Sequence, residues 1–295
     1  MIARMDGVQE HSEVFGQGVL SGQVALVTGG GTGLGKASAL ELVRCGASVT
    51  IAGRRSEVLE QAAAEIAELA GVAAEAAAGA IDWVAGDVRE REDARRLVRT
   101  VLERHGRLDL LVNNAGGQFF SPAELIAARG WRAVWRLNVE GMLNMSEAAF
   151  ELALEPAGAG GTIVNVTLSP HHGMPGMAHS GSARATVEAL TRELALRWQH
   201  AGVSVTAVAA GHFDTEVLAK YPASVRAGAS RTVPLQRLGT VAEHAWLVAL
   251  LASPLGKAFS GSTVTLDGAR DNWCGPWPPP GLADESGEVP TEERR

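Results

Sequence analysis

The sequence is poor in three features that would place it in other classes of protein. Its two cysteines, Cys45 and Cys274, are too few and too far apart for a disulfide framework or a zinc cluster. No apolar run approaches the roughly 20 residues that span a bilayer, and the first 23 residues lack the apolar core of a signal peptide. Acidic residues outnumber basic ones by 33 to 26, so no basic surface favours nucleic acid. We therefore expect a cytoplasmic protein with no membrane or nucleic-acid partner.

What the sequence does contain is a glycine-rich turn between two regular elements. The apolar run 24–27 is typical of a strand covered on both faces, and residues 36–44 show the apolar periodicity of a helix. Glycines between them allow a sharp turn and the close approach of a ligand, and the helix N-terminus favours a pyrophosphate. This spacing also occurs in simple tight turns, but the flanking elements favour a dinucleotide site. The predicted contacts are Gly29, Thr32, Gly33, Leu34 and Gly35.

Strand and helix patterns alternate through the rest of the chain. Further strands are predicted at 48–52, 81–85, 108–112, 162–166, 203–209 and 262–266. Helices are predicted at 56–70 with Ser56 as its cap, at 90–105, within 131–154, at 177–200 and at 241–251. Alternation with crossovers of about 20 to 40 residues predicts an α/β fold, a single-domain doubly wound parallel sheet of seven strands, or Rossmann fold. We place this domain at residues 20–269, between a flexible arm (1–19) and an extended, proline-rich tail (270–295).

The residues at the strand ends indicate which dinucleotide is bound, because ligands of such sheets lie outside the carboxyl ends of the strands. Arg54 and Arg55 follow the second strand, where an acidic residue would bind the ribose 2′-hydroxyl of NAD. Arginines there favour the 2′-phosphate of NADPH, although they could also be two exposed residues at a helix start. After the third strand, Asp87 is expected to accept a hydrogen bond from the adenine amine, and Val88 to pack on the ring.

Three motifs together resemble the short-chain dehydrogenase/reductase family. They are the turn from Thr28 to Gly35, the run Asn113-Asn-Ala-Gly116 and Asn138. The resemblance implies further cofactor contacts at Asn114, Ala115, Gly116, Gly211 and Thr215, and a substrate lid over residues 214–234. It also implies a homotetramer formed by the helices around 131–154 and 177–200, whose apolar faces could equally belong to the intrachain core.

The chain departs from this family at the catalytic positions. A typical member uses Ser, Tyr and Lys for carbonyl chemistry, and these positions fall on Leu168, Ser180 and Arg184, while the single tyrosine, Tyr221, lies elsewhere. A serine cannot act as a phenol-type acid near neutral pH, and an arginine does not readily lose its proton. Arg184 could still bind the ribose hydroxyls. Ordinary ketone reduction is therefore not expected.

Longer stretches are similar to the peroxisomal trans-2-enoyl-CoA reductases, a subgroup that also lacks the tyrosine in its usual place. They are residues 20–30, 111–124, 130–131, 179–185 and 271–273. The resemblance implies NADPH-dependent reduction of the C=C bond of an enoyl thioester in fatty acid metabolism. The last four residues are not a peroxisomal address, so that location is not expected here.

Reduction of an enoyl thioester places negative charge on the thioester oxygen, so the site needs a neutral hydrogen-bond donor. Gln118 is the first candidate donor, although it could also be an ordinary polar loop residue. Thr167 is the second candidate. The resemblance assigns Asn138 to a helix kink and a water chain. His171 and His172 could relay a proton, although solvated loop residues are the simpler interpretation. Neither they nor His179 has metal-ligand spacing, so no metal is expected.

These residues predict a reductase that uses NADPH and an acyl thioester, with Gln118, Thr167, Asn138 and Ser180 as its catalytic set. Two alternatives stay open at this point. The substrate could be another unsaturated ketone or aldehyde of a biosynthetic pathway. The loss of the Ser, Tyr and Lys could also leave a protein that binds NADPH without catalysis.

Overall fold

A computed structural model describes residues 12–16, 18–73, 79–169, 171, 176–216, 218 and 229–273. Several predicted features lie outside these residues. They are Tyr221, His172, Cys274, most of the 214–234 lid, residues 1–11 of the arm and residues 274–295 of the tail. In the part of the chain that is described, no helix combines the length and apolarity needed to cross a membrane.

The core of the fold is a parallel sheet of seven strands in the order β3-β2-β1-β4-β5-β6-β7. The strands are β1 (Val24–Thr28), β2 (Ser48–Gly53), β3 (Ile81–Ala85), β4 (Leu110–Asn113), β5 (Gly161–Leu168), β6 (Val203–Ala210) and β7 (Thr263–Leu266). Val27 of β1 pairs with Ile51 on one side and Val112 on the other. The strand order reverses between β1 and β4, so these two strands form the switch point at which such sheets bind ligands. The predicted doubly wound sheet is confirmed.

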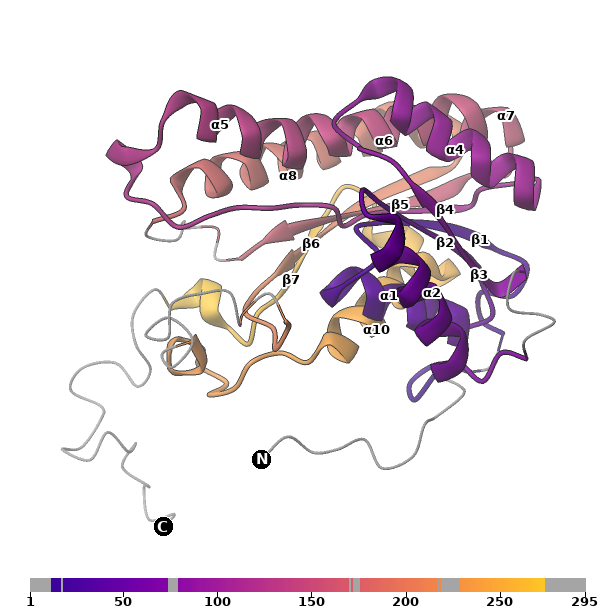
Figure 1. Cartoon of the computed structure of the whole chain (residues 1–295), viewed down its shortest axis with the longest axis horizontal. Helices are drawn as coiled ribbons and strands as arrows, with labels where there is room; N and C mark the ends of the chain where they lie inside the picture. Colours follow the sequence, from indigo (N-terminus) through magenta and orange to yellow (C-terminus); the bar gives the residue numbers. More distant parts are fainter. Residues whose placement is uncertain are drawn as a thin grey trace, which may run out of the picture.

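Helices cover both faces of the sheet (Figure 1). One layer contains α1 (Gly33–Arg44), α2 (Ser56–Leu69) and α10 (Val241–Ala252); the other contains α4 (Arg91–His105), α5 (Ala128–Trp135), α6 (Gly141–Ala149) and α8 (Ala178–Trp198). Alternate strand residues serve the two layers: Ala25 and Val27 join the first apolar cluster, whereas Val24 and Leu26 join the second. Covering both faces in this way explains why the central strands are almost wholly apolar.

The segment predicted as one amphipathic helix, 131–154, is helical throughout but is not regular. Two π-helical segments, η2 (Arg136–Glu140) and η3 (Phe150–Leu154), interrupt the α-helical path, which ends in α7 (Glu155–Ala157). In η2, the Asn138 amide donates to the carbonyl of Val134 at 2.7 Å. Single π-helical turns of this kind often occur at functional sites.

The ends of several elements differ from the prediction. Ser56 is the first residue of α2, whose N-cap is Arg55 without a side-chain hydrogen bond, so Ser56 is not the cap. The short helices η1 (Ala123–Leu125), η6 (Ser230–Thr232) and η7 (Pro254–Phe259) were not predicted, and η4 (Gln199–Ala201) extends the predicted helix at 177–200 by one residue. The folded chain also continues past residue 269, because Arg270–Asn272 form η8 and Arg270 is 8% exposed.

Candidate active site

The strands open at their carboxyl ends into a cavity of about 1050 Å³. Most of the predicted site residues line it, from both sides of the switch point. They are Gly29, Thr32, Gly33, Leu34, Arg54, Arg55, Asp87, Val88, Asn114, Ala115, Gly116, Gln118, Thr167, Arg184, Gly211 and Thr215. Three predicted residues, Gly35, Asn138 and Ser180, do not line the cavity but contact residues that do.

The turn after β1 depends on glycine at two positions. Gly29 has a φ of 64°, in the left-handed region, and its amide donates to Ala52 of β2 at 2.7 Å. A Cβ on Gly35 would lie 2.3 Å from both the Gly29 carbonyl oxygen and Nδ2 of Asn114. By contrast, a Cβ on Gly33 would meet nothing within 4 Å. Because Gly33 begins α1 and lines the cavity, the unpaired amides of the first helical turn are accessible to an anion there.

Asn114 holds this turn in place rather than reaching into the cavity with its amide. Its Nδ2 donates to the carbonyls of Thr28 and Gly29 at 3.0 and 3.2 Å, and the amides of Asn114 and Ala115 both donate to Oγ1 of Thr28 at 3.1 Å. These bonds lock the ends of β1 and β4 together at the switch point.

At the end of the cavity beside β2 and β3, Arg54 and Arg55 are exposed cations next to Gly53. The Asp87 carboxylate, predicted to accept from adenine, accepts from Arg89 through both of its oxygens. Hydrogen bonding to Arg89 lowers the pKa of Asp87, so that the group is a carboxylate at neutral pH. Arg89 was not singled out from the sequence.

At the other end, the chain brings Gln118 and Ser180 together. Ser180 lies in the first turn of α8, is wholly buried, and donates from Oγ to Oε1 of Gln118 at 3.4 Å. Asn138 clamps the same loop: its Oδ1 accepts from the Gly117 amide at 3.2 Å, and its Nδ2 donates to the Gly117 carbonyl at 2.9 Å. Ser180 thus contacts the side-chain amide of Gln118, and Asn138 fixes the backbone of the residue before it.

Arg184 lies one turn beyond Ser180 on α8. Its Nη1 donates to the Val166 carbonyl at 2.8 Å, and a Cβ on Gly116 would come within 2.4 Å of its Nη2. Burial lowers the pKa of Arg184 to about 10, so the guanidinium remains charged at neutral pH. Its Nε is buried without a hydrogen-bond partner among the described residues, as expected of a donor that awaits a ligand hydroxyl.

Thr167 is less suited to the role first considered for it. Its hydroxyl donates to Oε1 of Glu188 at 3.1 Å, in a buried contact, so it is not directed at a substrate oxygen in this arrangement. Glu188 is a site residue that the sequence did not single out. Burial raises the pKa of Glu188, and the neighbouring His171 and Arg192 only partly offset this effect.

His171 is exposed in the loop after β5, as the sequence suggested, but its ring is paired on both sides. Its Nε2 lies 3.1 Å from Oε1 of Glu188, and its Nδ1 lies 2.5 Å from Oδ2 of Asp271 in η8. Burial lowers the pKa of His171, but the hydrogen bond with Asp271 and the charges of both carboxylates outweigh it and raise the pKa overall. His171 therefore links the loop after β5 to α8 and to η8.

The remaining wall is formed by β6 and the segments after it. Gly211 packs so closely that an added Cβ would lie 2.5 Å from Cβ of Asp267, which explains the need for glycine at this position. His212 and Arg270 line the same wall, and burial lowers the pKa of His212. His179 packs against Phe119 and Trp131 with 1% of its surface exposed. The described residues contain no cluster of three or more side chains able to hold a metal ion.

A sheet with this topology, glycine turn and cavity is that of an oxidoreductase of the short-chain dehydrogenase family, and the chain belongs to it. The family model for short chain dehydrogenases matches residues 23–225, and the family membership expected from the three motifs is confirmed. Members act with a nicotinamide cofactor, which the glycine turn and the orphaned Nε of Arg184 are suited to hold.

Several relatives carry more particular names. The chain is 34% identical to the peroxisomal 2,4-dienoyl-CoA reductase of Danio rerio over 88% of this chain and 85% of that one. It is 33% identical to a probable 2,4-dienoyl-CoA reductase of Bacillus subtilis, over 87% and 98%. Among solved structures, a citronellol catabolism dehydrogenase of Pseudomonas aeruginosa PAO1 is 38% identical, covers 88% of this chain and 100% of its own, and superposes with a TM-score of 0.77.

Proposed function

We propose that this protein uses NADPH to reduce the C=C bond of a 2-enoyl or 2,4-dienoyl thioester, most simply an acyl-CoA. The observation that carries this proposal is the Gln118–Ser180 pair. At the position where a carbonyl reductase of this family has its tyrosine acid, this chain has Ser180, which orients the side-chain amide of Gln118. Such a group stabilises an enolate oxygen without giving up a proton. The names of the dienoyl-CoA reductases support the same class of substrate.

The residues that would hold NADPH line the cavity from the β1–β3 side to the β4–β6 side. The first turn of α1 would bind the pyrophosphate, and Arg54 and Arg55 the 2′-phosphate. Arg184 would bind the nicotinamide ribose, and Gly211 and Thr215 would lie against the carboxamide end. When bound, the reduced nicotinamide supplies the hydride.

The chain's own contribution to the reaction is to stabilise charge on the substrate. Ser180 donates to Oε1 of Gln118, which fixes the amide so that its NH₂ group and not its oxygen is directed away from Ser180. We assign this NH₂ group to the thioester oxygen, on which negative charge develops once hydride reaches Cβ of an enoyl thioester or Cδ of a dienoyl thioester. Asn138 keeps the loop at Gly117 from moving.

Cα of the substrate then needs a proton, and the buried groups behind Thr167 can hold one. Burial raises the pKa of Glu188, and Nε2 of His171 lies 3.1 Å from the same oxygen, so these two groups can share one proton. The Thr167 hydroxyl lies between Glu188 and the cavity. We therefore assign the proton to the Glu188–His171 pair: the Thr167 hydroxyl would give its own proton to Cα and take one back from the pair through Glu188.

The test is NADPH oxidation with a panel of enoyl-CoA and dienoyl-CoA substrates, followed by mass spectrometry of the products. Gln118→Ala should lower kcat by about 10² to 10³, the usual cost of an oxyanion donor, and leave the Kd for NADPH unchanged. Glu124→Gln, at an exposed residue of η1 in the same connection, is the matched control and should retain the wild-type rate. Tight NADPH binding with no turnover of any thioester would contradict the assignment of substrate.

A second candidate is a conjugated aldehyde or ketone that is not a thioester. The similarity to the citronellol catabolism dehydrogenase favours it, since that name does not specify an acyl-CoA. The same enolate chemistry applies, so the panel should include unsaturated aldehydes and ketones of similar length. Faster turnover of these compounds than of any thioester would select this alternative.

A further inference from the structure

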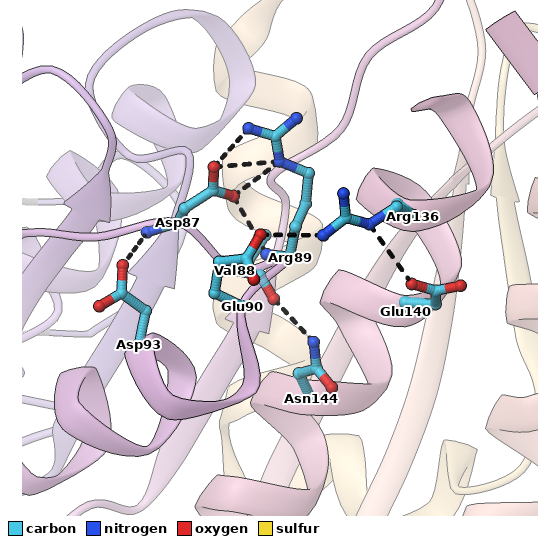
Figure 2. Close-up of polar contacts among 8 residues, drawn as sticks. All are labelled: Asp87, Val88, Arg89, Glu90, Asp93, Arg136, Glu140 and Asn144. Carbon is cyan, nitrogen blue, oxygen red and sulfur yellow. Dashed lines mark hydrogen bonds and ion pairs between the residues drawn. The ribbon is translucent and has the colours of Figure 1, made fainter. Parts of the chain in front are cut away.

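The loop that follows β3, residues 86–90, carries a cation beside the cavity wall. Nε of Arg89 lies 2.9 Å from Oδ1 and 3.0 Å from Oδ2 of Asp87, and its Nη2 also contacts Oδ2. The Arg89 backbone amide donates to Oδ1 at 3.1 Å. Both oxygens of the carboxylate thus accept hydrogen bonds from a single residue (Figure 2). Paired groups of this fork geometry are stronger than a single charged contact.

The backbone that carries Arg89 is anchored from three elements, as Figure 2 shows. The Asp87 amide donates to Asp93 of α4 at 2.9 Å, Nδ2 of Asn144 on α6 donates to the Val88 carbonyl at 3.0 Å, and Arg136 of η2 binds Glu90 at 2.8 Å. Because each flanking residue of the loop is held by a different element, the loop cannot carry the ion pair away from the cavity wall.

The ion pair lies at the end of the cavity beside β2 and β3, next to the two arginines proposed to bind the 2′-phosphate. Asp87 lines the cavity together with Arg54 and Arg55, and Arg54 is close enough for its charge to lower the pKa of Asp87 in addition to the larger effect of Arg89. The other two carboxylates of the loop region are engaged elsewhere, Asp93 with Arg96 and Glu90 with Arg136. Without Arg89, the carboxylate of Asp87 would offset one of the two cavity arginines.

We propose that Arg89 is a specificity-determining residue for the nucleotide, which neutralises Asp87 and thereby favours a dinucleotide with a 2′-phosphate over one without it. The inference rests on the proposed use of NADPH and adds a residue that does not itself line the cavity. A bare carboxylate repels a phosphate and accepts a hydrogen bond from the free 2′-hydroxyl of the adenosine ribose, which suits NADH. With its oxygens occupied by Arg89, the carboxylate repels a phosphate less and accepts hydrogen bonds from a ribose less readily.

Isothermal titration with NADPH and with NADH, at low and at high salt, tests this inference without any substrate. For Arg89→Gln, the ratio of Kd for NADH to Kd for NADPH should fall about five-fold, the effect of one unit charge acting near 10 Å at a partly solvated site. The change should shrink at high salt. The double variant Asp87→Asn/Arg89→Gln should return the ratio to the wild-type value, because it removes the unpaired charge. Arg89→Lys should keep most of the preference.

Arg95→Gln is the matched control, since Arg95 is a cation of α4 that binds Glu151; its ratio should equal that of the wild type. Equal weakening of both nucleotides by Arg89→Gln would show a purely structural role and overturn the inference. The inference would also be overturned if the wild type preferred NADPH and Arg89→Gln had the same ratio of Kd for NADH to Kd for NADPH as the wild type. Wild-type protein that binds NADH and not NADPH would instead overturn the proposed cofactor together with this inference.

Discussion

The two halves of the cavity are held together by different physical means. On the side of β1, β2 and β3, the turn after β1 contains glycines at which an added Cβ would clash with neighbouring atoms. Hydrogen bonds between Thr28 and Asn114 hold this turn in place. On the side of β4, β5 and β6, the wall consists of side chains that position one another: Ser180 holds Gln118, and Glu188 bridges Thr167 and His171. The first half depends on shape, whereas the second depends on which functional groups occupy it.

This difference explains how a catalytic tyrosine can be absent from a family member without loss of the fold. Ser180 and Arg184 occupy one face of α8, and the helix itself is packed by other residues such as Val187 and Leu194. Exchanging the functional groups therefore changes the chemistry at little cost in packing. The glycine turn has no such freedom, because its atoms are already in contact.

The largest effect should come from filling the turn. In Gly35→Ala, the added Cβ would lie 2.3 Å from the carbonyl oxygen of Gly29, so the turn must open. We expect the Kd for NADPH, measured by titration calorimetry, to rise by about 100-fold or more. Gly181→Ala, where a Cβ on α8 meets nothing within 4 Å, is the control and should bind NADPH normally. Normal NADPH binding by Gly35→Ala would remove the distinction between the two halves.

Removal of the two cations should have a smaller and more selective effect. In Arg54→Ala/Arg55→Ala, the 2′-phosphate loses charge-assisted hydrogen bonds, and NADPH affinity should fall by about 10- to 100-fold. NADH affinity should change by less than three-fold. Comparison of the two nucleotides in a fluorescence titration checks this, and equal loss for both would show that the arginines do not contact the phosphate.

A single hydroxyl in the second half should affect the rate and not the binding of cofactor. Ser180→Ala removes the donor to Oε1 of Gln118, so the amide loses its fixed orientation, and kcat should fall by about ten-fold, the equivalent of one ordinary hydrogen bond. Ser182→Ala, at an exposed position of the same helix, should leave kcat unchanged. If Ser180→Ala raised the Kd for NADPH and left kcat unchanged, Ser180 would instead contribute to cofactor binding.

The smallest effect concerns stability. The pKa of His171 is raised above 6.5 in the folded protein, so the protonated residue stabilises the fold below about that pH. This contribution should disappear as the pH rises through the folded-state pKa. The difference in free energy of unfolding between wild type and His171→Gln should therefore be larger at pH 6 than at pH 8.5 in denaturant titrations.

Asp271→Asn should reduce the same pH-dependent component, because the Asp271 carboxylate contributes to the raised pKa. A difference between wild type and His171→Gln that grows with pH would mean that the neutral imidazole is the form bound in the folded state.

The sequence predicts the half that depends on local geometry better than the half that depends on contacts distant in the chain. The doubly wound parallel sheet, the glycine turn and the place of Arg54, Arg55 and Asp87 at strand ends follow from the pattern of strands and helices. Arg184 could be placed because it lies in a recognisable stretch of α8. The role of His171 could not, since its partner Asp271 is 100 residues away in sequence.

Two further features were missed for physical reasons. Glu188 appears in the sequence as one charge on a long helix, and only packing against β5 shows that it is buried. The π-helical segments leave no signal in apolar periodicity over a window as short as five residues. Their positions depend on side chains such as Asn138, whose amide bonds with the loop at Gly117.

The π-helical segment at Arg136–Glu140 also sets the rotational phase of the helix that contains it. Each residue turns an α-helix by about 100°, so the wider π turn changes the direction in which α5 faces relative to α6. Deleting one residue between 136 and 140 would rotate α5 as a unit and carry Trp131 away from His179, while α6 kept its contacts with the sheet. A one-residue gap in this short stretch would therefore reshape the wall beside Gln118 without unfolding the domain.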